Sequence, residues 1–115
     1  MPFEHLSSRV ILSHNSAYGE TADGQQFSYT VGITHPEIIS SVVLHAGCMD
    51  NGIYIYVDGS QVFYTYMPED SNYCDHEQNV DITSNVINKS SITVSGYHIV
   101  KRKGGGNFYI TVNYK

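Results

Sequence analysis

Six acidic or imidazole side chains lie in and beside one polar stretch, residues 68–79: Glu69, Asp70, Asp75, His76, Glu77 and Asp81. Carboxylates gathered on a loop can supply the roughly six to eight oxygen ligands that Ca²⁺ takes. The stretch has no D-x-D-x-D-G pattern, and most acidic loops are simply solvated. If a cation binds, we expect Asp75, Glu77 and Asp81 to hold it, and calcium is then the expected ion. Otherwise the chain is expected to have no cofactor.

The histidines and cysteines form no recognisable catalytic or zinc motif. The closest spacing is Cys74-Asp75-His76, and the sequence contains neither H-E-x-x-H nor G-x-S-x-G. A cysteine nucleophile would need a base and an orienting group, and no motif ties these together. Cys48 and Cys74 could pair or stay free. His45 sits in an apolar run and is expected to be a hydrogen-bonded core or rim residue. We therefore predict a protein that is not an enzyme.

Half of the six basic residues stand together at Lys101-Arg102-Lys103, before three glycines. This pattern predicts a hairpin tip. Such a tip could clamp an anionic group on a partner, or its charge could simply keep an exposed hairpin soluble.

Sugar recognition calls for an aromatic face against the apolar side of the ring and polar side chains for its hydroxyls. The predicted loops and the last hairpin carry such side chains. The candidates for ligand contact are Tyr18, Asp50, Asn51, Asn72, Tyr73, Tyr97 and Asn107.

These side chains must be positioned by strands, because apolar residues alternate with a period of two and helical periodicity is nearly absent. In residues 53–57, Ile53, Ile55 and Val57 are expected to face the core and Tyr54 and Tyr56 the solvent. Seven more strands are predicted over residues 9–13, 26–33, 38–46, 61–67, 80–83, 91–100 and 107–114.

Turn residues separate the predicted strands. Asp58-Gly59 is typical of a two-residue hairpin with positive φ at both positions, and His35-Pro36 should end a strand because proline cannot donate to a ladder. Residues 47–52 are predicted to be a loop ending in Asn51-Gly52, and residues 84–88 a turn. About eight short strands at even spacing predict one antiparallel β-sandwich over residues 1–115.

Composition limits the partners. The 115-residue chain has ten tyrosines, no tryptophan and a formal charge of −5. That charge argues against a nucleic-acid partner, since such proteins normally carry a basic face. No stretch approaches the roughly 18 apolar residues of a membrane span, so no membrane insertion is expected. The first residues lack the pattern of a signal peptide, and an extracellular or virion-associated location stays open.

Three segments resemble those of galactose-binding-like jelly-roll domains, the lectin and carbohydrate-binding-module type. They are residues 39–46 (ISSVVLHA), residues 50–59 (DNGIYIYVDG) and residues 80–86 (VDITSNV), followed by a closing strand pair that ends near Asn113. The resemblance covers about residues 36–113. It implies a jelly-roll sandwich that binds glycans or proteins through loops at one end. The small calcium-dependent galactophilic lectins have an acidic loop before the last strand, whereas residues 101–107 here contain no acidic residue.

We therefore predict a non-enzymatic, lectin-like domain whose partner is a glycan or glycoprotein. Two alternatives stay open. One is a structural or interaction module of a phage tail, fibre or capsid that works as a homo-oligomer, since a tyrosine-rich neutral surface suits self-association. The other is an acidic inhibitor protein.

Overall fold

The computed structural model describes residues 8–15, 25–49, 52–66, 78–99 and 106–115, which form an eight-stranded antiparallel sandwich. The strands and two short helices follow one another as β1 (Arg9–Asn15), β2 (Gln26–Gly32), η1 (Pro36–Ile38), β3 (Ile39–Met49), β4 (Gly52–Val57), β5 (Ser60–Tyr66), β6 (Gln78–Asp81), α1 (Thr83–Val86), β7 (Ser91–Ile99) and β8 (Gly106–Tyr114).

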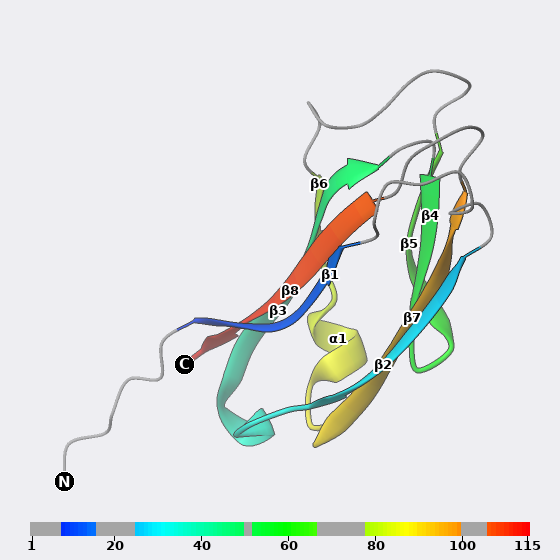
Figure 1. Ribbon diagram of the computed structural model, residues 1–115. Coiled ribbons are helices and arrows are strands. Elements are labelled where there is room, and N and C mark those ends of the chain that lie inside the picture. Colours follow the sequence, from blue (N-terminus) through cyan, green and yellow to red (C-terminus); the bar gives the residue numbers. More distant parts are fainter. Residues whose placement is uncertain (1–7, 16–24, 50–51, 67–77, 100–105) are drawn as a thin grey trace, which may run out of the picture.

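The strand order is that of a jelly roll. One sheet runs β1-β8-β3-β6 and the other β2-β7-β4-β5, so the chain passes repeatedly from one sheet to the other. In Figure 1 the two sheets face each other, and α1 lies between them at one end. The predicted fold class is confirmed.

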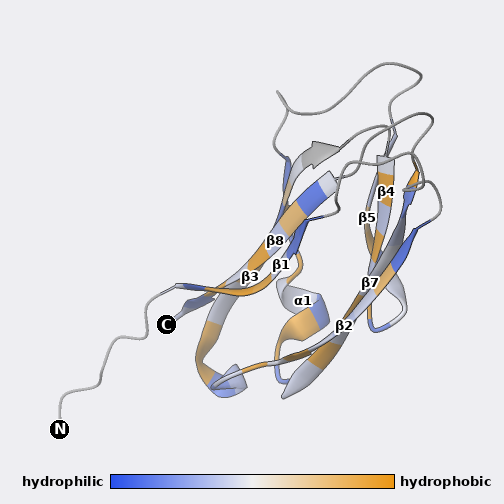
Figure 2. Cartoon of the chain, in the orientation of Figure 1, coloured by the Kyte–Doolittle hydropathy of each residue, from blue (hydrophilic) through white to orange (hydrophobic). Residues whose placement is uncertain are grey.

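The core forms where the two inner faces meet. Figure 2 shows apolar bands alternating with polar ones along the strands, as expected when successive side chains point to opposite faces. The predicted inward set of β4 is confirmed, since Ile53, Ile55 and Val57 are at most 1% exposed. The opposing sheet contributes its own buried residues, among them Val42, Leu44, Phe108, Ile110 and Val112.

The turn predictions hold at two places. Asp58 and Gly59 have φ values of 48° and 84°, as the predicted two-residue hairpin requires. The strand before His35-Pro36 ends at Gly32, and Pro36 begins the 3₁₀ turn η1.

The predicted loop over residues 47–52 was too long. β3 continues to Met49 and pairs with β8 as far as Gly106, with an irregular register after Ala46. The side chain of Asn107 packs against Gly47, where a Cβ would meet its side-chain oxygen at 2.0 Å, so a larger residue there would require Asn107 to move. A second irregularity, between Ile39 and Ser41, brings Ile39 into the core, whereas simple alternation had grouped it with His45.

The predicted strand over residues 80–83 and the turn after it were also displaced. β6 ends at Asp81 and the short helix α1 begins at Thr83. The reason is a set of hydrogen bonds at Thr83. The Asp81 carboxylate accepts hydrogen bonds from the backbone N–H and the hydroxyl of Thr83, and the Thr83 hydroxyl oxygen accepts one from the backbone N–H of Val42 on β3. Thr83 is thereby held out of the ladder, while Ile82 and Val86 on either side are fully buried.

Candidate functional site

Only three of the residues predicted to bind a ligand or metal lie in the described part of the chain. Tyr97 is in β7, Asn107 in β8 and Asp81 in β6. The others lie outside the described residues: Tyr18, Asp50, Asn51, Asn72, Tyr73, Asp75 and Glu77.

Two of these three have structural contacts. Asp81 binds Thr83, which holds the pKa of its carboxyl below the ordinary value. Asn107 has its side chain against the backbone of Gly47. Within the described residues there is no group of three or more histidine, cysteine or acidic side chains that could hold a metal ion.

Tyr97 belongs to a surface that the loop-based prediction did not foresee. It lies opposite Tyr54 on β4, and Tyr54 lies opposite Tyr64 on β5. The ring centroids of Tyr54 and Tyr97 are 4.7 Å apart in a stacked arrangement, and those of Tyr54 and Tyr64 are 4.5 Å apart. We call Tyr97, Tyr54 and Tyr64 the tyrosine row. Gln26 on β2, paired with Tyr97, extends it to the edge of the sheet.

The tyrosine row faces solvent. It lies on the side of the β2-β7-β4-β5 sheet away from the core, because the neighbouring residues Ile53 and Ile55 point inwards and are fully buried. Tyr64 is 46% exposed. Tyr56 stands beside Tyr54 on the same face of β4, with ring planes only 7° apart. Crowding among these rings reduces the solvation of the Tyr97 phenol and raises its pKa above the ordinary value.

Among the described residues, the strands around the row are polar and neutral. The four strands of this sheet contain no Asp, Glu, Lys or Arg. Their outward positions on β2 and β7 are occupied by Ser28, Thr30, Thr93 and Ser95, because the residues between them turn towards the core. Hydroxyl groups and an amide beside aromatic rings can bind a hydroxylated ligand that also has an apolar face.

The signal that could have found the row was present in the sequence. Tyr54 and Tyr56 are predicted to face solvent, but the candidates for ligand contact are sought in the loops and the last hairpin and do not include them. The pairing of Tyr54 with Tyr97 depends on the order of strands in the sheet, which the sequence does not show.

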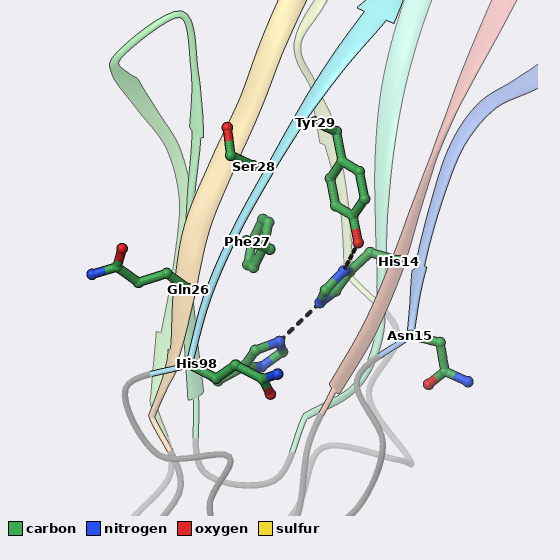
Figure 3. A pocket seen from close by; sticks show the side chains of 8 residues that line it. His14, Asn15, Gln26, Phe27, Ser28, Tyr29 and His98 are labelled. Atoms are coloured by element: carbon green, nitrogen blue, oxygen red, sulfur yellow. Dashed lines mark hydrogen bonds between the residues drawn. The ribbon is translucent and has the colours of Figure 1, made fainter.

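A second feature lies between the two sheets, where β1 and β2 form neighbouring edges. A pocket of about 350 Å³ opens there, within the range of roughly 300–1,000 Å³ typical of ligand sites. Figure 3 shows its side chains, with His14 between Tyr29 and His98. The pocket is lined by His14, Asn15, Gln25, Gln26, Phe27, Ser28, Tyr29 and His98.

The two histidines are almost completely buried and hydrogen-bonded to each other. His14 is 8% and His98 1% exposed, and their Nε2 atoms are 2.9 Å apart. Nδ1 of His14 lies 2.5 Å from the hydroxyl oxygen of Tyr29. Nδ1 of His98 is buried and has no hydrogen-bond partner among the described residues.

Burial lowers the pKa of both histidines. The pKa of His98 falls to about 4, first because its charged form would be desolvated and then because of repulsion from His14. The pKa of His14 is lowered by desolvation as well. Both imidazoles are therefore neutral at pH 7, and each carries one donor and one acceptor nitrogen.

The outer face of the other sheet carries a smaller aromatic pair. His45 stacks on Tyr109 with ring centroids 4.4 Å apart, and its nitrogens bind the side chains of Asn79 and Thr111. The prediction that His45 is a hydrogen-bonded rim residue is confirmed.

Comparison with known proteins supports the fold. No family model matches the chain, and no curated protein matches it. Among solved structures, the crystal structure of BuGH86E322Q in complex with neoagarooctaose is similar, with a TM-score of 0.53 and 14% sequence identity. The similarity covers 94% of this chain, and this chain spans 19% of that one. At this identity the likeness shows a shared β-sandwich fold.

In the part of the chain that the structure describes, no helix is long and apolar enough to cross a membrane.

Proposed function

We propose that this chain is a carbohydrate-binding domain without catalytic activity, and that the tyrosine row binds the glycan. The observation that carries the proposal is the alignment of three tyrosine rings across neighbouring strands, on the solvent-facing side of a sheet whose described strands contain no charged side chain. Aromatic rings contact the apolar C–H face of a sugar, and nearby hydroxyl and amide groups bind its hydroxyls.

The dimensions of the face favour a short oligosaccharide segment. The row and Gln26 cross four strands, which at a spacing of about 4.8 Å span about 14 Å. A sugar unit is about as long as one strand spacing, so a segment of a few units can lie across the sheet. The neutral strands and the overall charge of −5 favour neutral glycans over sulfated or uronic ones.

Two further observations agree with this proposal. The sandwich resembles galactose-binding-like jelly rolls in its sequence pattern. The similar solved structure contains neoagarooctaose, which makes this oligosaccharide a reasonable first ligand to test.

Isothermal titration calorimetry with neoagarooctaose and a panel of neutral hexasaccharides tests the proposal. Replacing the central residue, Tyr54→Ala, removes both ring contacts and should weaken binding at least tenfold, equivalent to about 1.4 kcal/mol. Tyr97→Ala should act in the same direction. Tyr109→Ala is a matched control, because this tyrosine is 37% exposed on the outer face of the other sheet.

Absence of binding to every panel sugar at millimolar concentration would contradict the proposal. Equal loss of affinity in the Tyr54 and Tyr109 variants would place the ligand elsewhere. A reducing-sugar assay on the same panel checks the absence of catalysis.

Self-association is a second candidate, favoured by the exposed tyrosines of the edge strand β5. Tyr64 and Tyr66 are 46% and 37% exposed on β5, which is an edge of the sheet among the described strands, and such edges can pair with another chain. Light scattering at two concentrations distinguishes the two candidates. A stable oligomer that Tyr64→Ser converts to monomer supports self-association, and a monomer at both concentrations contradicts it.

A further inference from the structure

The pocket between β1 and β2 is separate from the tyrosine row. Tyr97 and His98 are consecutive residues of β7 and point to opposite faces of the sheet. Tyr97 belongs to the solvent-facing row, while His98 is 1% exposed between the sheets. A ligand on the row therefore does not occupy the pocket.

The lining of the pocket is aromatic and polar but carries no permanent charge. None of its eight residues is Asp, Glu, Lys or Arg. Phe27 supplies an apolar ring, lying 4.4 Å from His14 and 5.7 Å from His98 between ring centroids. Gln25 is a further polar residue of the lining, whereas the side chains of Asn15 and Gln26 point away from the histidine pair in Figure 3. This combination suits a neutral ligand that carries hydroxyl groups and one apolar face.

We infer that this pocket is a second ligand site, which takes one small neutral hydroxylated molecule, namely a single sugar unit. The volume of about 350 Å³ accommodates one such unit, whereas the tyrosine row suits several. The choice of a sugar over another polyol rests on the proposed function, but the existence of the site does not.

The hydrogen-bond network of the pocket leaves room for a ligand. The single hydrogen shared by the two Nε2 atoms can belong to either ring. If the hydrogen is on Nε2 of His98, Nδ1 of His98 carries a lone pair, and if it is on Nε2 of His14, Nδ1 of His98 carries an N–H group. In both cases Nδ1 of His98 lacks a partner among the described residues. Unpaired buried polar groups are unfavourable. Because this nitrogen has almost no accessible surface, a ligand hydroxyl or a water pairs with it only when neighbouring side chains move aside.

Nitrogen-15 NMR of the histidine rings tests the inference on the intact protein, with galactose, glucose and mannose as probes. The Kd expected for so small a ligand is roughly 1–10 mM, so each sugar is added up to about 50 mM, about fivefold above the weaker value. We expect one of these sugars to shift the ring nitrogens of His14 and His98 in a saturable way. The ring of His45, on the outer face of the other sheet, should not move.

A pair of matched variants locates the effect. Phe27→Leu removes the ring from the pocket wall and should weaken binding of the sugar at least fivefold. Phe63→Leu is the control, because Phe63 is also an inward phenylalanine on an edge strand of the same sheet but does not line the pocket. The wild-type measurement decides the question even if Phe27→Leu fails to fold.

The two proposals can fail separately. If oligosaccharides bind and Tyr54→Ala abolishes that binding, but no sugar moves the His14 and His98 signals, the pocket site is refuted and the proposed function stands. If a single sugar still shifts both rings in the Tyr54→Ala variant while no oligosaccharide binds the wild type, the tyrosine row is refuted and the pocket stands.

Discussion

Lowering the pH from 7 to 4 should destabilise the fold through the buried histidine pair. The pKa of His98 is about 4 in the folded chain, against an ordinary value of 6.5. A histidine whose folded pKa is depressed favours the neutral folded state. The contribution of His98 to the free energy of unfolding is therefore complete above pH 6.5. It is lost as the pH falls towards 4, because the unfolded chain binds the proton at a higher pH than the folded chain does.

The size of the loss follows from the shift. The difference between 6.5 and about 4 corresponds to about 3 kcal/mol for His98. His14 adds in the same direction, since its pKa is lowered too. Small domains are typically stable by roughly 5–15 kcal/mol, so this loss is a large part of the total.

Urea denaturation at several pH values, followed by circular dichroism, measures this effect. Between pH 6.5 and 4 the free energy of unfolding should fall by up to about 1.4 kcal/mol per pH unit for each proton taken up. Protonation of Asp58 and Asp81 contributes little to the change in stability between pH 6.5 and 4, because the pKa values of both carboxyls lie below the ordinary 3.8.

Two variants separate the histidine pair from the rest of the chain. His98→Phe removes the buried titrating group and should lose most of this slope. His45→Gln, which changes a histidine on an outer face, should keep it. A wild-type stability that stays constant between pH 6.5 and 4, or an unchanged slope in His98→Phe, would refute the reasoning.

Two further predictions concern the backbone. Gly96→Ala should lower the free energy of unfolding by about 2 kcal/mol or more, because the new Cβ would stand 1.9 Å from the carbonyl oxygen of Tyr54. Gly32→Ala should change it little, because no atom lies within 4 Å of a Cβ there, and equal effects of the two variants in thermal denaturation would contradict this. Asp58→Ala should destabilise the β4–β5 hairpin by about 1 kcal/mol, because the carboxylate accepts a hydrogen bond from Lys89 and the residue has positive φ. Asp58→Asn should cost less in the same assay, since asparagine tolerates that conformation, and an Asn variant as unstable as the Ala variant would count against it.

The sandwich itself was predictable because its signals are local. Alternation at Ile53, Ile55 and Val57 separates core from solvent, and Asp58-Gly59 specifies the tight turn that follows. Both depend on side-chain period and on allowed φ values, which are properties of short segments. The errors arose where a tertiary contact overrode the pattern, as when Thr83 left the ladder to bind Asp81 and Val42.

The tyrosine row illustrates what the sequence left undecided. A regular two-residue hairpin at Asp58-Gly59 would place Phe63 opposite Tyr54. An irregularity in the register between Ile55 and Tyr56 instead places Tyr64 there and turns Phe63 into the core. That shift is favoured by burial of the phenylalanine against the other sheet, so it depends on the packed sandwich.

By itself, the sequence determined which residues alternate and where the chain turns, and therefore that the tyrosines of β4 face solvent. Only the tertiary structure decided which distant residues meet. Tyr97 reaches Tyr54 because β7 lies beside β4, and His14 on the edge strand β1 reaches His98 on β7 because the two sheets pack face to face. The physical reason is that strand order and register are set by the burial of the whole core, to which every strand contributes.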